Sequence, residues 1–587
     1  MRRKLNLKIA KRVIAVCLVL LISVGAVSCG TAEERFGAFL DESLVAMLQE
    51  CDTLTLNFLL KDPEAFGIQQ GDVTFGNISG GAQAESGGMN PELMFKLFFN
   101  YNNLTDEQKI IYNTMQFNIK LSEQYSADFA YLNDYLIGSN SVIGYLPILM
   151  SEYTFYNKES IRTYLDLIKT FEDYIDQVIE FEIAKSNEGK FISDESLDKF
   201  LKDCRQFLES KDENVLVVSF NEKIDAFKGL SESEITEMKS ENKKTFDSVI
   251  VPAYEKLMTK MEALKGTGKK SVGISEYTGG KKYFEYLAQA KTGSSKTAKE
   301  MKNMIVEKME TLENIMRDLE ERDPKIQENY INAKFALENP EEILLQLQED
   351  IKKDFPPAPD VNYTVKYVSK ALEESLNPAF YLIPPIDDPT NNVIYINGSE
   401  KYKDMDIFTT LAHEGYPGHL YQSVYFASQD VHPIRKLMSF SGYEEGWATY
   451  VEFHSYEFGD FDPELKRYMQ AAGLYNLLSS ALIDISINYE GKDFGWMLDL
   501  YADSGVSEDR IKEYYLAIIS DPGQYLPYAV GCLEIMEMRD YAMAELGNDF
   551  SYKTFHKTIL DVGAVPFDVV KNEVDKYVET AKNSEAA

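Results

Sequence analysis

The sequence predicts a mainly α-helical protein in two lobes, with only a little β-structure. Apolar residues recur at three- and four-residue intervals over most of the 587 residues, as they do on the buried face of a helix. A stretch rich in glycine and lysine, residues 262–283, interrupts this pattern and separates a predicted N-terminal helical lobe (29–265) from a second lobe (266–587). The clearest strand is Val-Ile-Tyr-Ile at 393–396.

The individual elements follow from local patterns. Residues 34–62 are predicted to form one helix because their large apolar side chains fall at helical intervals. A glycine-rich loop covers 75–91, and helical periodicity then runs almost unbroken over 92–264. After the interruption it resumes at 297–322. Two further segments are rich in proline and are predicted to be extended: 353–360 and 380–399.

The N-terminus has the pattern of a bacterial export signal. Six positive residues and no acid precede the apolar run VIAVCLVLLISVGAVS. That run ends in Ala-Val-Ser before Cys29, which resembles a lipobox, so residues 1–28 are predicted to be a signal peptide and Cys29 to be acylated. The alternative is an uncleaved signal-anchor helix. Either outcome places the chain outside the cytoplasm, attached to the membrane at its N-terminus.

Composition excludes some partners. The formal net charge is −35, from 60 Lys+Arg against 95 Asp+Glu, so the basic footprint of a nucleic-acid-binding protein is missing. Three scattered cysteines remain after Cys17 and Cys29, and they form neither a disulfide framework nor a zinc-ribbon spacing. We therefore expect a globular protein tethered to the membrane, with no nucleic-acid partner.

The stretch HEGYPGH, from His413 to His419, is a candidate metal site with unusual spacing. The zinc-protease motif H-E-x-x-H places two histidines one helical turn apart, with a glutamate beside the first. Six residues of regular helix would instead leave His413 and His419 roughly 120° apart around the axis. Pro417 and Gly418 can interrupt the helix and so change this separation, because proline disrupts a helix and glycine permits backbone angles closed to other residues. A break there would return His419 toward His413, with Glu414 beside them.

A third ligand is expected from a carboxylate on another element, as in catalytic sites with two histidines and one glutamate. The segment GYEEGWATYVEFH, which begins 23 residues after His419, carries Glu444, Glu445 and Glu452. Its apolar residues, such as Trp447, mark a buried face, so at least one of these acids should point inward. A buried carboxylate needs a cation or a hydrogen-bond network. The competing interpretation is a solvated helix start, where acids are favourable in any case.

These motifs together resemble the bacterial domain of unknown function 885 family, predicted zinc metallopeptidases with an H-E-x-x-P-G-H motif and a downstream E-G-W-A. The likeness extends over roughly residues 34–575 and includes the segment GISEYTGGKKYFEYLAQAKTGSSKTAKEM. It also covers the stretch DPGQYLPYAVGCLEIMEMRDYA, whose matching positions are Pro522, Gly523, Gln524, Tyr528, Gly531 and Arg539. The resemblance implies a helical, two-lobed, metallopeptidase-like architecture with a little β near the active-site cleft.

Transferred residue by residue, the resemblance implies His413, His419 and Glu445 as ligands of one Zn²⁺ per chain. It implies Glu414 as the general base. The family often has a second histidine directly after the position of His419, where this chain has Leu420.

Further roles are predicted for three residues. The match to Y-x-x-G makes Tyr528 a candidate oxyanion donor, against the alternative of a tyrosine that only packs. Arg435 and Arg539 match family arginines and are candidates for holding a substrate carboxylate. Internal salt bridges are the competing explanation for both. His432, His454 and His556 are interpreted as structural or surface residues.

The predicted function is a membrane-tethered zinc peptidase, in which Glu414 activates water beside the metal. Dipeptidase, carboxypeptidase, endopeptidase and wall-peptide hydrolase activities all fit one metal and one base. The alternatives are a non-catalytic binding lipoprotein of the solute-binding type and a zinc amidase acting on non-peptide substrates.

Overall fold

The computed structural model describes residues 30–585 except 70, 79–90, 127–128, 358, 369, 371–372, 374–375 and 404. Helices account for 67% and strands for 3%, which confirms the prediction of a mainly helical protein with little sheet. The predicted signal peptide, Cys29 and most of the glycine-rich loop lie outside the described residues. Within the described part of the chain, none of the helices combines the length and the apolar character needed to cross a bilayer.

The first helices pack around a cluster of aromatic side chains. Phe36 of α2 lies 4.9 Å from Phe99, measured between ring centroids, and both are buried. The prediction of a single helix over 34–62 is wrong, because Asp52 accepts a hydrogen bond from the Thr55 N–H and so begins a new helix. The helices of this part are α2 (Ala32–Gln49), α3 (Thr53–Leu59), α4 (Pro91–Phe98) and α5 (Asp106–Glu123).

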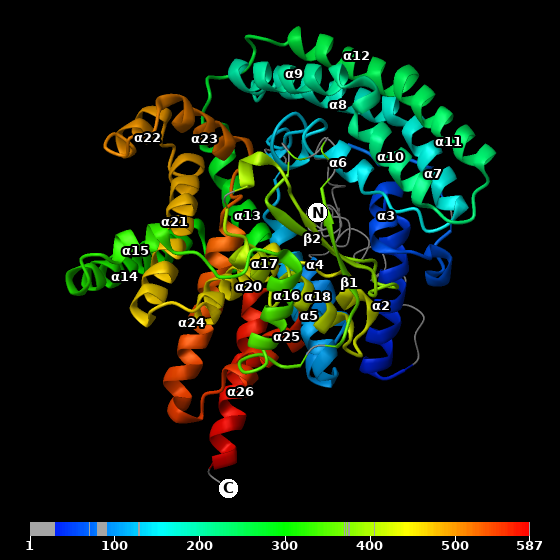
Figure 1. The fold of residues 1–587 in the computed structure, drawn as a ribbon. Helices are drawn as coiled ribbons and strands as arrows, with labels where there is room; N and C mark the ends of the chain where they lie inside the picture. Colours follow the sequence, from blue (N-terminus) through cyan, green and yellow to red (C-terminus); the bar gives the residue numbers. More distant parts are fainter. Residues whose placement is uncertain are drawn as a thin grey trace.

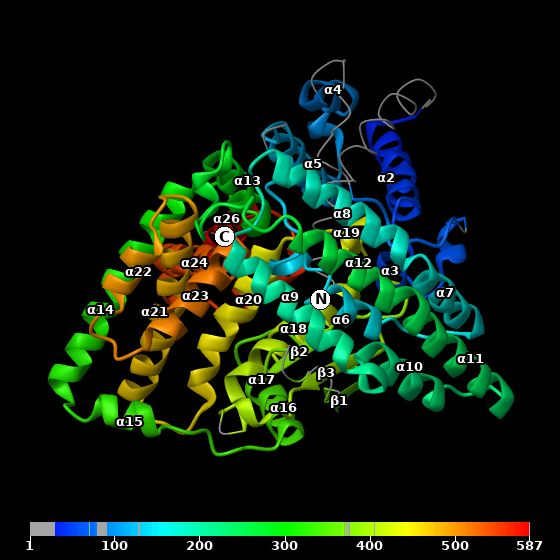
Figure 2. The same ribbon diagram turned by 90° about the horizontal axis from the view of Figure 1, so that it is seen from above.

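A second group of helices forms a layer with a hydrophobic core of its own, which we call the helical layer. Figure 1 shows it arching over the rest of the molecule, and Figure 2, seen from above, shows it lying across the sheet. Its members are α6 (Leu146–Ser151), α7 (Lys158–Lys169), α8 (Phe171–Asn187), α9 (Asp194–Glu209), α10 (Val215–Ala226), α11 (Glu232–Thr245) and α12 (Val251–Glu262).

The remaining helices form the body of the molecule, and most of them surround the largest hydrophobic core. The predicted helix over 297–322 is present as α14, where Thr297 and Glu300 form a capping box at its start. The body helices are α13 (Gly280–Thr292), α14 (Ala298–Arg322), α15 (Ile326–Asn332), α16 (Pro340–Asp350), α17 (Phe408–Glu414), α18 (His419–Ala427), α19 (Pro433–Leu437), α20 (Ser441–His454), α21 (Pro463–Asn488), α22 (Phe494–Leu500), α23 (Glu508–Ser520), α24 (Leu526–Leu546), α25 (Tyr552–Val562) and α26 (Phe567–Glu585).

A three-stranded sheet lies between the body and the helical layer. Its strands are β1 (Tyr363–Tyr367), β2 (Ala379–Leu382) and β3 (Asn392–Ile396), in the order β1-β3-β2. β3 pairs parallel to β1 and antiparallel to β2, and it contains the predicted strand. Successive side chains point to opposite faces, so Tyr381 and Ile394 join the core of the body while Phe380 and Tyr395 pack against that of the helical layer. The division into lobes at residue 265 stays a prediction.

Candidate metal centre

A short turn separates the two histidines of HEGYPGH. α17 ends at Glu414 and α18 begins at His419, so the helix is interrupted where proline and glycine predicted a break. The turn is closed by the Gly418 N–H, which donates to the carbonyl oxygen of Ala412 at 2.9 Å. A Cβ atom on Gly418 would lie 1.8 Å from the His413 carbonyl oxygen, so only glycine fits this approach. As a result the two imidazole rings lie 4.7 Å apart between centroids.

The third side chain comes from α20. The indole N–H of Trp447 donates to the Pro417 carbonyl oxygen at 2.9 Å and so ties α20 to the turn. Behind it, α20 packs closely on α24, because a Cβ atom on Gly446 would lie 2.3 Å from the carbonyl carbon of Gly531. The glycines of E-G-W and Y-x-x-G are therefore explained by helix packing. This packing fixes where Glu445 points.

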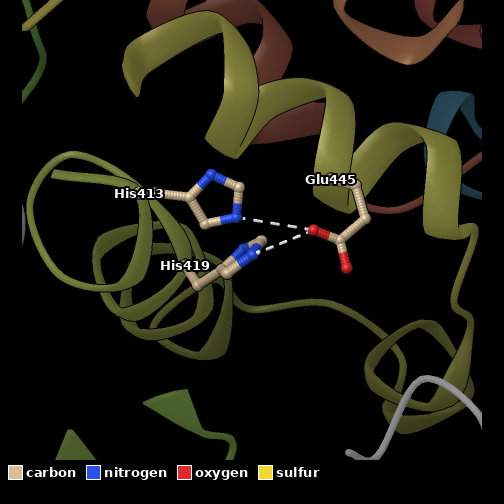
Figure 3. A group of neighbouring side chains, drawn as sticks. All are labelled: His413, His419 and Glu445. Atoms are coloured by element: carbon tan, nitrogen blue, oxygen red, sulfur yellow. Dashed lines mark ion pairs between the residues drawn. The ribbon is translucent and has the colours of Figure 1, made fainter. Parts of the chain in front are cut away.

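Figure 3 shows the resulting group, with His413, His419 and Glu445 converging on one point. The Glu445 Oε2 atom lies 3.5 Å from His413 Nε2 and 3.3 Å from His419 Nε2. One ligand atom from each residue lies within 4.8 Å of the others, and the side chains of His419 and Glu445 are buried. The three residues that the resemblance implied as metal ligands are thus brought together. Glu444 instead accepts a hydrogen bond from the Ser439 hydroxyl at 3.0 Å.

The donor set fits a zinc ion. Zinc bonds of roughly 2.1 Å in tetrahedral geometry place ligand atoms about 3.4 Å apart, close to the two separations that Glu445 makes. Two imidazole nitrogens and one carboxylate oxygen are also the donors of catalytic zinc sites, which keep a fourth position for water or substrate. His413, His419 and Glu445 would hold such an ion.

Glu452 completes the surroundings of His413, although no separate role was predicted for it. Its Oε2 lies 2.9 Å from His413 Nδ1, on the side of the ring away from Glu445. Burial lowers the pKa of His413, but hydrogen bonds with Glu445 and Glu452 outweigh it and raise the pKa to about 10. The sequence spacing could have indicated this position of Glu452, because Glu445 and Glu452 are seven residues apart and share one face of a helix. Carboxylates on both sides of this ring favour a bound cation.

Glu414 and Tyr528 border the same cavity as His413 and Glu445. The carboxylate of Glu414 accepts a hydrogen bond at 2.9 Å from the backbone N–H of Tyr381 in β2, so the small sheet lies beside the candidate centre. The Tyr528 ring, in the first turn of α24, lies 6.4 Å from the His413 ring between centroids. The structure therefore gathers the predicted base and the predicted oxyanion donor around the histidines.

The two predicted substrate-binding arginines are not part of this group, and neither lines the cavity. Arg435 is buried, and its guanidinium contacts Glu107 at 3.0 Å and the Val562 carbonyl oxygen. Arg539 lies three turns beyond Tyr528 on α24 and pairs with Asp540. These contacts are those of the alternative interpretation, in which both arginines form internal salt bridges and do not bind substrate. Sequence spacing could not reveal the positions, because both arginines lie on helices whose orientation is set by packing.

The other three histidines lie elsewhere. His432 is at the start of α19, 3.2 Å from Asp41. His454, the last residue of α20, and the buried His556 lie together on the other side of this helix, where His556 contacts the hydroxyl of Tyr450 at 3.0 Å. These positions fit their interpretation as structural residues.

A cavity of about 2170 Å³ opens at the candidate centre. One wall belongs to the body and includes His413, Glu414, Glu445 and Tyr528. The opposite wall belongs to the helical layer and to the loops before it. A molecule that enters this cavity can therefore reach His413 and Glu445.

Comparisons with known proteins agree with the fold. A crystal structure described as the "putative lipoprotein from Colwellia psychrerythraea" matches with a TM-score of 0.71 and 16% identity, over 97% of this chain and 99% of that one. A "putative lipoprotein of unknown function" from Shewanella oneidensis matches with a TM-score of 0.58 and 17% identity, over 93% and 99% of the two chains. Identities this low show a shared fold alone.

Sequence comparison identifies the family. No functionally curated protein matches the chain. A family model described as "Bacterial protein of unknown function (DUF885)" matches residues 65–574, which include every residue of the candidate centre. The chain therefore belongs to the DUF885 family of bacterial proteins.

Proposed function

We propose that this protein is a zinc-dependent peptidase, tethered to the membrane outside the cytoplasm. The observation that carries the proposal is the convergence of His413, His419 and Glu445, with Glu414 beside them, at the wall of a large cavity. A purely structural zinc site is closed by four protein ligands, whereas this group offers three and opens to a cavity. That arrangement leaves room for water and substrate.

Zinc held there would supply a Lewis acid that polarises the substrate carbonyl and lowers the pKa of its water ligand to about 7. The protein's own groups perform the proton transfers. Glu414 accepts the proton of the attacking water and later delivers it to the leaving amine. Its hydrogen bond from the Tyr381 N–H holds the carboxylate in place before substrate binds. Tyr528 donates to the oxyanion as negative charge develops on the carbonyl oxygen.

Glu452 acts on the opposite side of His413. A carboxylate that accepts from the second ring nitrogen of a metal-bound histidine fixes its tautomer and orientation and makes the other nitrogen a better ligand. The 2.9 Å contact between Glu452 and His413 Nδ1 suits that role. Glu452 is therefore proposed as a positioning residue.

The membrane tether is supported by sequence. The basic start, the apolar run and the lipobox-like residues before Cys29 are those of a bacterial lipoprotein. Two proteins of the same fold are also described as putative lipoproteins. The peptidase would then act on peptides outside the cytoplasm.

The second candidate is a zinc amidase acting on non-peptide substrates, since the same groups hydrolyse any amide that fits. The base beside the ligands disfavours a third candidate, a binding lipoprotein with no catalysis. A binding protein has no use for a carboxylate placed to take a proton from water.

The decisive experiment measures metal by mass spectrometry in the full-length protein purified in detergent, with His413→Ala and Glu445→Ala beside it. About one zinc per chain, lost in both variants, is the expected result, because a catalytic site binds one ion through three protein ligands. Glu444→Ala is the matched control and should keep its zinc, since Glu444 contacts Ser439 instead. Absence of zinc from the wild type after incubation with zinc would contradict the proposal.

A further inference from the structure

The cavity is much larger than a single small substrate needs. Pockets for small ligands typically measure about 300–1,000 Å³, and this one measures about 2170 Å³. Its lining runs from the candidate centre in the body to α7 and α9 of the helical layer. A dipeptide bound at His413 and Glu445 would leave most of this volume empty.

Contacts between the two sides limit what can enter. At one place Lys61 pairs with Asp388 at 2.7 Å, and Asp387 accepts hydrogen bonds from the backbone N–H groups of Lys61 and Asp62. At another, Gly138 lies so close to Ser520 that an added Cβ atom would be 2.1 Å from the Ser520 carbonyl oxygen. Lys61, Asp62, Gly138 and Ser520 all line the cavity. These contacts narrow the access to the cavity, which favours an extended chain over a folded domain.

The cavity lining suits a peptide backbone. The wall formed by the helical layer and the segments before it includes Asn140 and Thr163, which carry an amide and a hydroxyl group. Each peptide unit brings one donor and one acceptor, which such groups can satisfy. No arginine lines the cavity among the described residues, and its eleven acidic residues outnumber its five lysines. Two of these lysines, Lys185 and Lys291, are paired with Asp134 and Asp521. The lining is thus poorly suited to phosphates or other polyanions.

We infer that the cavity takes an unfolded oligopeptide. The scissile bond lies at His413, His419 and Glu445, and the rest of the chain contacts the opposite wall around Asn140 and Thr163. This inference rests on the proposed peptidase function and names its substrate class. It excludes folded proteins as substrates, and it makes dipeptides poor ones because they cannot reach the opposite wall.

The test measures binding and cleavage as a function of peptide length. Peptides of one repeating sequence, from dipeptide to decapeptide, are titrated by calorimetry into full-length Glu414→Gln protein in detergent with zinc present. The same peptides are then assayed for kcat/KM with the wild type. We expect the decapeptide to bind at least about tenfold more tightly than the dipeptide, a difference of about 1.4 kcal/mol. Equal affinity at all lengths would overturn the inference. So would cleavage of a folded protein as fast as the decapeptide, or equally tight binding of a neutral oligosaccharide of matched length.

Substitutions in the opposite wall test where the bound peptide contacts the protein. Asn140→Trp and Thr163→Trp place a bulky side chain in the cavity and should each weaken decapeptide binding by about tenfold, again about 1.4 kcal/mol. Asp166→Trp is the matched control on α7, because Asp166 is exposed and does not line the cavity. Equal decapeptide affinity in all three variants and the parent would contradict the assignment of this wall.

The outcomes separate this inference from the proposed function. Length-dependent binding without hydrolysis by the wild type would refute the peptidase and leave the oligopeptide cavity supported. Hydrolysis with no dependence on length would refute the oligopeptide cavity and leave the peptidase supported.

Discussion

Two groups of histidines lie on opposite sides of helix α20 and have opposite surroundings. On one side, His413 lies between the carboxylates of Glu445 and Glu452. On the other, His556 contacts a backbone carbonyl oxygen, that of Asp354, at 2.6 Å and the hydroxyl of Tyr450 at 3.0 Å. Its ring also stacks on Phe355 at 4.2 Å between centroids.

Burial acts on both histidines, but their pKa values shift in opposite directions. Burial lowers the pKa of each histidine, because a charged ring is poorly solvated in the interior. Around His413 the two carboxylates outweigh burial and raise the pKa to about 10. Around His556 burial dominates, with a further lowering from His454, and the pKa falls to about 3. The comparison teaches that the partners of a buried histidine decide whether its position attracts a cation or holds a neutral ring in the core.

The largest expected effect tests the base of the candidate centre. Glu414→Gln keeps the shape of the side chain but cannot accept a proton, so peptide hydrolysis should fall by about 10²–10⁴-fold. Zinc content should stay that of the wild type, because Glu414 is not among the proposed ligands. Steady-state kinetics and metal analysis on the same preparation check both points. A fully active variant would refute the mechanism.

A smaller effect is expected at Glu452. Glu452→Gln replaces one of the two carboxylates beside His413, and zinc affinity should fall by about 10–100-fold, as for other groups that orient metal ligands. Competition with a chelator measures the affinity. Glu457→Gln is a control, since Glu457 lies beyond the end of α20 and contacts Gln470. Unchanged affinity in Glu452→Gln would mean that its contact with His413 does not support the metal.

A substitution in the histidine cluster on the other side of α20 should lower the stability of the protein without changing its zinc content. His556→Gln should lower the free energy of unfolding by about 1–3 kcal/mol, because it disturbs buried hydrogen bonds to Tyr450 and Asp354. Its zinc content should equal that of the wild type. Denaturant titration and metal analysis test the pair of outcomes, and loss of zinc would show that the two sides of α20 are not independent.

A further effect is expected in the pH dependence of stability. The pKa of His556 is depressed from 6.5 to about 3 in the folded protein, so the unfolded chain binds more protons between these values. The stability that His556 contributes is therefore present above about pH 6.5 and is lost as pH falls toward 3, by at most about 1.4 kcal/mol per pH unit. Comparing unfolding free energies of the wild type and His556→Gln across this range isolates the effect from that of the carboxylates. Parallel pH profiles would contradict the assignment.

Much of the local structure could be predicted from sequence. Helical periodicity and capping residues predict helices such as α14, and the break at Pro417 and Gly418 was expected from the chemistry of those two residues. The motifs also selected Glu445 over Glu444. The single helix predicted over 34–62 failed because apolar periodicity continues through Asp52, whereas the cap that this residue forms depends on a backbone turn.

Sequence alone determined the residue types of the candidate centre, since two histidines with a glutamate between them and a downstream E-G-W already specify a zinc-like donor set. Only the tertiary structure decided which other residues join it. Glu452 contacts His413, and Arg435 and Arg539 do not line the cavity, because helix packing sets the direction of each side chain. The close contact of Gly446 with Gly531 is an example, because the two helices approach each other where neither has a side chain. Spacing along the chain records the turn of one helix, but distances between helices depend on how their side chains pack.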